Sequence, residues 1–457
     1  MDKLSYISNQ LIRIMILIPI LGYTQAEDIN ETEKLALRND LQQEFLGHYD
    51  QERFQQSILP AKKIVVLTEE IYGENNFRLI TPLNNLASAY YMVEDFENAQ
   101  ISFLQCIDLI ESNQNIISPE LISPLYGFAL TLNQSGQYEA AITILERALR
   151  INYVNLGFHN LDQLKIHDTL TESYIGVKNF EQANHHQTFQ VYVNKKHFGV
   201  NNSMVDESLI KLSIWYKRTG QIFLEREVHD ELLKRQANRT TDQIKPLIET
   251  YKNISFSHRR EGVDIYQSLS PLKQALEKIN AMENTDLFLK FEVLLDLGDT
   301  YTSYGRVQSG MRAYEECWNL IDEDPGMSQL IKERFSRPVK IRNILLPGIY
   351  PLPEVGEENE ADQTGYISLR YAIDVNGKTA NIEVIESDPE GFIDRVAVSA
   401  IKKTVYRPVY IEAEPQESSD INFRHEFLYS IGSKGKKSNE PEAEEELEDK
   451  PLENPIA

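Results

Sequence analysis

The chain has 457 residues, enough for more than one domain or for one long repeat array, and 41% of them are hydrophobic, enough for packed cores. Its formal net charge of −24 argues against binding to nucleic acid or to an anionic membrane surface, because both depend on clustered lysine and arginine. Its two cysteines cannot supply a disulfide framework.

Residues 1–26 have the pattern of a signal peptide. Lys3 and Arg13 flank a polar start, an apolar run covers residues 14–23, and Thr24 and Ala26 place small residues before a cleavage point. The apolar run is about half of the ~20 residues that a membrane span needs. We therefore expect export, with a mature chain that begins near Glu27 in the periplasm or another extracytoplasmic space. The alternative is an uncleaved membrane anchor or a buried helix.

Residues 30–330 repeat one pattern with a step of 42 residues. The marker of this pattern is a small residue at the point where the second helix of a helical hairpin meets the first. The marker positions are Ser57, Ala99, Ala141, Ala183 and Glu225, and two further steps plus one residue reach Gly310. A fixed step of this size indicates stacked helical hairpins.

Other residue types keep their distance from the marker. Aromatic residues lie nine positions before it, aromatic or aliphatic residues three before it, and turn residues five before it. The residues nine positions before the marker are Tyr90, Tyr174, Tyr216 and Tyr301. Those three positions before it are Phe54, Phe96, Tyr138, Phe180, Ile222 and Val307. Those five positions before it are Glu52, Glu94, Gly136, Gly220 and Gly305. Cys106, Ala148 and Cys317 come seven positions after it, so we interpret both cysteines as buried structural thiols.

The repeats resemble the tetratricopeptide repeat, most closely at Leu297-Gly298 with Tyr301 and Gly305. The usual period is about 34 residues, and the longer step resembles the extended variant of kinesin-light-chain-like repeats. The resemblance implies an α-solenoid whose concave surface binds a peptide or protein partner. The alternative is a spacer that holds the ends apart. Between residues 245 and 282 the pattern is weak, and Ser270-Pro271 predicts a break in the second helix of that repeat.

Residues 337–431 change to the period of β-strands. Residues 365–374 alternate apolar and other residues, Asn376-Gly377 predicts a type I′ hairpin turn, and residues 379–386 form a second strand. An amphipathic helix and a last strand follow, which predicts a β-β-α-β unit with an antiparallel sheet. The expected inward residues are Ile367, Leu369, Tyr371 and Ile373; Phe392, Ile393, Val396, Ala397, Ala400 and Ile401; and Ile421, Phe423, Phe427 and Tyr429. The expected fold is therefore mainly α: a solenoid followed by a small α+β domain.

This module resembles the C-terminal domain of TonB, the energy transducer of Gram-negative outer-membrane import. The elements that carry the resemblance are Tyr350-Pro351, Gly365-Tyr366-Ile367, Asp374-Val375-Asn376-Gly377-Lys378, Val384-Ile385-Glu386-Ser387, Phe392-Ile393-Asp394 and Tyr406-Arg407-Pro408. They cover roughly a fifth of the chain, and the ordered set is more specific than any single element.

The resemblance implies that the domain takes up a short extended peptide, the TonB box of an outer-membrane transporter, by strand addition at a sheet edge. The edge would be the last strand, residues 422–429, with residues 350–351 alongside it. The candidate partner-binding residues are Tyr350, Pro351, Arg407, Asn422, Phe423, Arg424 and His425. The alternative is that Tyr350, Pro351 and Arg407 only close the fold.

The chain departs from a TonB transducer in two ways. Its N-terminal apolar run is short, and a repeat array stands in place of a proline-rich rod. Residues 432–457 form an acidic tail that we expect to be disordered, since residues 438–457 carry eight acidic residues and one lysine.

No constellation of residues predicts catalysis, a cofactor, a metal or a small-molecule substrate. His185 and His186 are adjacent and would point about 100° apart on a helix, and His159 and His167 lack acidic neighbours at ligand spacing. His425 is interpreted as a packed or rim histidine. The expected function is protein–protein interaction in the periplasm with engagement of an outer-membrane transporter in energy-dependent transport. The alternative is an envelope scaffold whose TonB-like domain only docks or multimerises.

Overall fold

The computed structural model describes residues 31–237, 244–350 and 363–429, which form a mainly helical region followed by a small β-rich region. The predicted signal peptide, Pro351 and the predicted acidic tail lie outside the described residues. The chain divides into two compact units, residues 1–228 and 229–457, and each is described by itself. None of the described helices combines the length and apolar character needed to cross a membrane.

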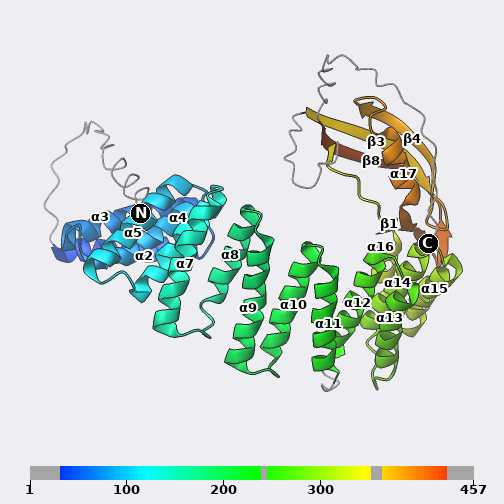
Figure 1. The fold of residues 1–457 in the computed structure, drawn as a ribbon, viewed down its shortest axis with the longest axis horizontal. Coiled ribbons are helices and arrows are strands. Elements are labelled where there is room, and N and C mark those ends of the chain that lie inside the picture. Colours follow the sequence, from blue (N-terminus) through cyan, green and yellow to red (C-terminus); the bar gives the residue numbers. More distant parts are fainter. Residues whose placement is uncertain (1–30, 238–243, 351–362, 430–457) are drawn as a thin grey trace, which may run out of the picture. The chain divides into compact units, whose positions relative to one another are not determined.

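The first unit is built from helical hairpins joined by short connections (Figure 1). Its helices are α2 (Glu31–Tyr49), α3 (Phe54–Tyr72), α4 (Ile80–Met92), α5 (Phe96–Asn113), α6 (Ile122–Gln134), α7 (Tyr138–Leu156), α8 (Leu164–Gly176), α9 (Phe180–Phe198), α10 (Ser203–Arg218) and the start of α11 (Ile222–Gln236), with 3₁₀ turns η1 (Phe77–Leu79) and η2 (Pro119–Leu121). A largely apolar core runs from Leu41 to Leu170.

The helix boundaries confirm the repeat pattern. The residue three before each marker is the first residue of a second helix: these residues are Phe54, Phe96, Tyr138, Phe180, Ile222 and Val307. The residue five before the marker has a positive φ whether or not it is glycine, for example 57° at Glu52, 63° at Glu94 and 72° at Gly136. A single left-handed residue reverses the chain between the two helices.

The small marker positions are buried. Ser57, Ala99, Ala141 and Ala183 have no exposed surface. Cys106 and Cys317 are also fully buried and free, as expected for structural thiols. Burial raises the pKa of the Cys106 thiol to about 12, so it stays protonated and unreactive at neutral pH.

The predicted helix break at Pro271 is wrong. Helix α13 (Ile265–Asn280) runs through this proline, which is its seventh residue. Pro60 holds the same place in α3. Pro271 leaves the Gln267 carbonyl without a helical N–H donor, and the buried apolar side chains that follow offset this loss. These are Leu272, Ala275 and Ile279.

The second unit contains the remaining hairpins and the sheet. Its helices are the end of α11, then α12 (Ile244–Glu261), α13, α14 (Leu287–Ser303), α15 (Val307–Glu323) and α16 (Ser328–Phe335), with the 3₁₀ turn η4 (Pro325–Met327). Its strands are β1 (Val339–Arg342), β2 (Ile349–Tyr350), β3 (Gln363–Ile373), β4 (Thr379–Asp388), β5 (Val405–Arg407), β6 (Val409–Ile411), β7 (Glu414–Gln416) and β8 (Ser418–Tyr429), and α17 (Asp394–Lys403) follows β4.

The main sheet has the order β2-β8-β3-β4, and β1-β5 and β6-β7 form separate two-stranded ladders. The long elements β3, β4, α17 and β8 follow the predicted β-β-α-β order (Figure 1). The sequence pattern missed the short strands because two to four residues carry no measurable period. The inward residues of β3 are buried as predicted, with at most 1% exposure for Ile367, Leu369, Tyr371 and Ile373.

Two details of this domain differ from the prediction. Gly377 has a φ of 78° but Asn376 does not have a positive φ, so the hairpin turn is not type I′. Instead the Gly377 N–H donates to the Asp374 carbonyl, which closes a type I-like turn with a left-handed glycine. Ile393 just before α17, and Ala397, Ala400 and Ile401 within it, are buried, whereas Phe392 and Val396 are 46% and 48% exposed. Its buried stripe is therefore narrower than predicted.

Candidate functional site

Strand β8 has a full partner on one side only. It pairs antiparallel with β3 from Gln363↔Tyr429 to Ile373↔Ser418. On its other side, β2 pairs with Leu428 and Tyr429 in parallel. The residues from Asn422 to Phe427 have no strand partner on that side in the described part of the chain, and we call this stretch the open edge.

The backbone of the open edge points outward at alternate residues. The Leu428 N–H donates to the Gly348 carbonyl, on the side of β2. The pairing of β8 with β3 is regular from Asn422 to Tyr429, so every second residue faces the same way. The N–H and C=O groups of Asn422, Arg424 and Glu426 therefore face the open edge, where an added strand would find donors and acceptors.

The inward side chains of β8 form an aromatic row. Phe423 and His425 stack at 6.5 Å between ring centroids, and His425 and Phe427 stack at 6.0 Å. The His425 Nε2 lies 2.8 Å from the Pro347 carbonyl oxygen. These contacts make His425 a packed histidine, and the described residues contain no group of three metal-ligating side chains.

Between Asn422 and Glu426 the outward side chains of β8 are charged or polar. The Arg424 Nε donates to Glu426 Oε1 at 3.2 Å, and its guanidinium lies 3.9 Å from the centroid of the Tyr366 ring. Asn422 Nδ2 donates to the Asp420 carbonyl at 3.2 Å. Both residues are exposed, so an added strand would meet a polar face on this side and an aromatic face on the other.

Tyr350 lies beside the open edge, as expected. It pairs with Tyr429, and its ring lies 5.3 Å from the Phe427 ring. Asn422, Phe423, Arg424 and His425 share the open edge with it.

Arg407 lies elsewhere and does not face the open edge. It is 5% exposed, and its Nη1 lies 3.3 Å from Asp299 Oδ1 on α14. Its guanidinium also lies over the Phe335 ring, 5.4 Å from the centroid. Asp299 accepts a second hydrogen bond from the Tyr314 hydroxyl at 2.9 Å. We call this group of contacts the joint, because it fastens the β-rich domain to the last repeat.

Apolar packing extends the joint. Tyr410 on β6 is buried in the same core cluster as the helices α12–α16. Its ring lies 5.1 Å from Phe335 and 5.4 Å from Tyr314. The alternative reading of Arg407, that it closes the fold, therefore agrees with its position.

The opposite edge of the sheet is less suited to strand addition. Its edge strand β4 pairs with β3 through two register shifts, and Asn381 on β4 has a φ of 50°. Glu383, Glu386 and Asp388 add negative charge to it. Bulges and charges are features that keep an edge strand from pairing, so the open edge of β8 is the better site.

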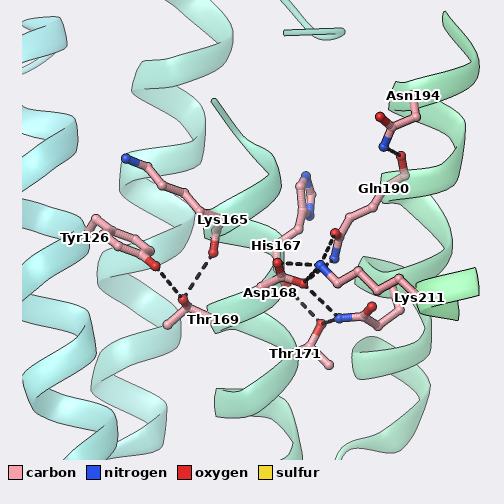
Figure 2. A network of polar contacts seen from close by, with 10 residues as sticks. Tyr126, Lys165, His167, Asp168, Thr169, Thr171, Gln190, Asn194 and Lys211 are labelled. Atoms are coloured by element: carbon pink, nitrogen blue, oxygen red, sulfur yellow. Dashed lines mark hydrogen bonds and ion pairs between the residues drawn. The ribbon is translucent and has the colours of Figure 1, made fainter. Parts of the chain in front are cut away.

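The first unit contains a polar network that the sequence did not predict. The Asp168 carboxylate on α8 accepts hydrogen bonds from Lys211 on α10 at 2.5 Å and from Gln190 on α9 at 2.8 Å. Figure 2 shows these side chains converging from three helices, with Thr169 joined to Tyr126 of the preceding repeat. The network ties successive helices together by hydrogen bonds. The contacts of Tyr126 with Thr169 and of Asp168 with Lys211 each join residues 43 apart, one more than the step, so the repeat pattern did not point to them.

A buried histidine pair lies next to this network. The Nδ1 atoms of His167 and His186 are 2.8 Å apart. Burial, with a smaller effect of neighbouring histidines, lowers the pKa of His167 to about 3 and that of His186 to about 4. Both are therefore neutral at pH 7 and are packing residues.

Comparison with known proteins identifies both parts. A family model for the C-terminal domain of the Gram-negative bacterial TonB protein matches residues 356–427, which include the whole open edge. A tetratricopeptide-repeat model matches residues 80–113 and 122–155, which are the hairpins α4–α5 and α6–α7. Among curated proteins, none matches this chain.

Several solved structures of helical-repeat proteins are similar to this chain at low identity. The repeats of a kinesin-light-chain-type protein of Podospora anserina are 15% identical, with a TM-score of 0.39 over 46% of this chain and 98% of that one. The protein pilF of Pseudomonas aeruginosa is 12% identical, with a TM-score of 0.34 over 57% and 97%. With TM-scores this low, these similarities carry no argument. The chain carries tetratricopeptide repeats followed by a TonB C-terminal domain.

Proposed function

We propose that the protein is a non-enzymatic periplasmic adaptor whose TonB-like domain binds an extended segment of an outer-membrane transporter at the open edge. The helical repeats recruit a second protein. The binding mode is strand addition, in which main-chain hydrogen bonds supply the affinity and side chains supply the specificity. This activity serves energy-dependent transport.

One observation carries this proposal: β8 is regular from Asn422 to Tyr429, and its outward N–H and C=O groups at Asn422, Arg424 and Glu426 have no strand partner in the described residues. Strand β2 already adds to the same side at Leu428 and Tyr429. A peptide strand would continue the sheet along the remaining residues.

A proline substitution tests the edge directly. Arg424→Pro removes the outward N–H and fills its place with a ring, while the ladder to β3 keeps its hydrogen bonds at the neighbouring residues. Arg424→Ala is the matched control, since it removes the same side chain and keeps the N–H. We expect Arg424→Pro to abolish transporter binding and Arg424→Ala to retain it. Equal loss in both variants would assign the effect to the side chain and overturn strand addition.

The joint favours a second function, an envelope scaffold. A transducer of the TonB family carries its C-terminal domain on a long rod, whereas Arg407 and Tyr410 of this domain are buried against α14–α16. A domain seated on its repeats is suited to holding partners at a fixed geometry. In this function the open edge would bind a structural protein of the envelope.

A photo-crosslinking residue in place of Asn422 separates the two functions in living cells. Crosslinks to the periplasmic end of an outer-membrane transporter support the first function, and crosslinks only to other envelope proteins support the scaffold. The same crosslinker in place of Glu383 on β4 is the control. Fusion of residues 1–30 to a reporter that is active only outside the cytoplasm tests the location, and a silent reporter would contradict it.

A further inference from the structure

A cleft lies between two neighbouring hairpins of the first unit, α8–α9 and α10–α11 (Figure 1). It is formed at the hairpin turns, where α8 and α10 end and α9 and α11 begin. Its volume is about 470 Å³, which is within the range of ligand-binding clefts. The apolar and polar parts of its lining are Ile175, Phe180 and Trp215, and Asn184, Thr219 and Gln221.

An aromatic ring fills the corresponding place at the preceding junction of hairpins. There the ring of Tyr138 lies against Gly176, so that a Cβ on this glycine would come within 2.3 Å of the ring. One step of 42 residues later the same two positions are Phe180 and Arg218. Arg218 has a Cβ where the glycine leaves room, so Phe180 cannot pack in the same way. The ring of Phe180 is 52% exposed and becomes a wall of the cleft.

Two side-chain amides bridge the hairpins beside this wall. Asn184 Nδ2 donates to Gln221 Oε1 at 2.8 Å, and Gln221 Nε2 donates to Asn184 Oδ1 at 2.9 Å. Trp215 Nε1 also donates to Asn184 Oδ1, at 2.6 Å, and Gln221 Nε2 also donates to Thr219 Oγ1, at 2.7 Å. These four hydrogen bonds fix the orientation of both amides.

The amide pair keeps one donor and one acceptor free. No hydrogen bond within the described residues uses the second hydrogen of Asn184 Nδ2 or the second lone pair of Gln221 Oε1. These two atoms are 2.8 Å apart, so the free donor and the free acceptor are adjacent. In an extended strand the N–H and C=O of one residue face the same side. One residue of an extended segment can therefore bond to both amides.

The charges at the cleft favour an uncharged side chain in it. Its lining contains one acidic and one basic residue, Glu181 at the start of α9 and Arg218 at the end of α10. The Arg218 charge also acts on the carboxyl group of Glu172 on α8. An acidic anchor would thus meet two carboxyl groups near one guanidinium, and a basic anchor would meet that guanidinium. An apolar anchor avoids the cost of moving a charge out of water.

We propose that this cleft binds an extended segment of a partner protein through one residue with an apolar side chain. The N–H and C=O of that residue bond to Gln221 and Asn184. Its side chain stands perpendicular to these bonds and packs between Phe180 and Trp215. The inference rests on the proposed recruitment of a second protein by the repeats, and it gives the site and the chemistry of that contact.

Titration of the full chain with blocked tripeptides tests this proposal. The probe is N-acetyl-alanyl-phenylalanyl-alanine amide. One comparison peptide has alanine in place of its phenylalanine, and the other has an ester oxygen in place of the phenylalanine N–H. The chain contains two tryptophans, Trp215 and Trp318. Fluorine-labelled tryptophan therefore gives one NMR signal from the cleft and one reference signal, and Trp318→Phe assigns them.

We expect the probe to shift the Trp215 signal and to leave the Trp318 signal in place. The alanine peptide should bind at least about tenfold more weakly, and the ester at least about threefold more weakly. A peptide that binds only at the open edge of β8 would leave the Trp215 signal unchanged. An unmoved Trp215 signal, or an ester that binds as tightly as the amide, would overturn the proposal. Free phenylalanine that binds as tightly as the probe would assign the cleft to a small molecule instead.

Two variants locate the binding. Phe180→Ala removes one wall and should bind the probe at least about fivefold more weakly. Phe223→Ala is the matched control, because Phe223 is 69% exposed and is not part of the lining, and it should bind like the wild type. Gln221→Leu removes the acceptor for the peptide N–H, so it should bind the amide and the ester equally. Equal loss in Phe180→Ala and Phe223→Ala would overturn the proposal.

A photo-crosslinking residue in place of Phe223 separates the cleft from the proposed recruitment in living cells. A protein whose crosslinks disappear with Phe180→Ala supports both. A protein that stays crosslinked with Phe180→Ala overturns the cleft proposal and leaves recruitment by the repeats intact. Absence of any crosslinked protein, when the tripeptide binds as expected, contradicts recruitment and supports the binding chemistry of the cleft.

Discussion

Two ion pairs, one in each unit, differ in burial more than in geometry. In the second unit Arg407 and Asp299 are 3.3 Å apart, and their side chains are 6% and 11% exposed. In the first unit Lys211 and Asp168 are only 2.5 Å apart, but their side chains are 48% and 37% exposed. The shorter pair is the weaker one, because water screens it and remains available to either partner after a substitution. Because the joint is buried, loss of either Arg407 or Asp299 would leave the other as an unpaired buried charge.

The neighbours of the two carboxylates sharpen this difference. Asp299 accepts hydrogen bonds from Arg407 and Tyr314, both buried. Asp168 accepts from Gln187 and Gln190 as well as from Lys211, so it has replacement donors if the lysine is lost. The joint is therefore a contact whose removal affects the whole second unit, whereas the network of Asp168 is a local contact.

Loss of the Asp299 carboxylate is expected to have the largest effect. Asp299→Ala leaves the buried Arg407 cation and the Tyr314 hydroxyl without their acceptor, which should destabilise the second unit by about 3–5 kcal/mol. Hydrogen exchange measured separately for peptides of residues 31–228 and of residues 229–429 checks this. The second unit should lose protection and the first should keep it.

A paired control keeps this test specific. The double variant Asp299→Leu, Arg407→Met replaces both charges with apolar groups of similar size, and it should recover much of the stability. If the double variant is as unstable as Asp299→Ala, the loss comes from shape and not from the unpaired charge.

Acid should destabilise the first unit through its buried histidine pair. Burial lowers the folded-state pKa of His167 to about 3 and of His186 to about 4, from an ordinary value of 6.5. At a pH between the folded-state pKa of each histidine and its ordinary value of 6.5, the unfolded chain binds more protons than the folded one. Stability is therefore complete above pH 6.5 and falls as the pH decreases through this window, by about 1.4 kcal/mol per pH unit for each histidine.

Thermal unfolding of the first unit at pH 7.5 and at pH 5 measures this loss. At pH 5 the expected destabilisation is about 2 kcal/mol for each histidine. His186→Gln retains a polar side chain that cannot be protonated, and it should flatten the pH dependence. A variant with an unchanged pH profile would mean that groups other than this histidine cause the loss.

A smaller effect is expected where the two helices of the last hairpin, α14 and α15, approach each other closely. A Cβ on Gly298 would lie 2.2 Å from the ring of Tyr314, the residue that also donates to Asp299. Gly298→Ala should therefore destabilise the second unit by about 1–3 kcal/mol through overpacking. Gly47→Ala is the control in the first unit, because nothing lies within 4 Å of its Cβ position, and it should stabilise helix α2 slightly. Urea unfolding of both variants measures the difference.

Periodicity explains which parts of the fold the sequence predicted. The step of 42 residues found one recurring aromatic or aliphatic position, and the structure shows that it begins a second helix, as at Phe54, Tyr138 and Val307. A repeat is visible in the sequence because it places one residue type in one environment many times. The inward residues of β3 were predicted for the same reason. Pro271 was misread because a local helix-breaking rule was applied without the packing that offsets it.

Contacts between distant segments were beyond this kind of reasoning. Arg407 was grouped with the residues of the open edge on the family pattern, but its partner Asp299 lies 108 residues earlier in the chain. Asp168 and Lys211 come from different repeats, and no period links a carboxylate to its cation. The open edge itself followed from the position of the last strand, whereas its limits at Leu428 and Tyr429 depended on β2, a strand of two residues.

The smallest effect is expected for the exposed pair. Lys211→Met keeps the apolar stem of the side chain and removes the charge, and Asp168 retains its bonds from Gln187 and Gln190. We expect a loss below about 1 kcal/mol, and a double-mutant cycle with Asp168→Asn should give a coupling that shrinks as salt is added. The corresponding cycle at Asp299 and Arg407 should give a larger coupling energy. Salt should barely change it, because burial keeps the ions of the solvent away from the pair. A coupling at Lys211 as large and as salt-resistant as that of the joint would show that the glutamines of α9 shield the network from water. The burial of an ion pair would then have to be judged by its neighbours as well as by its own exposed surface.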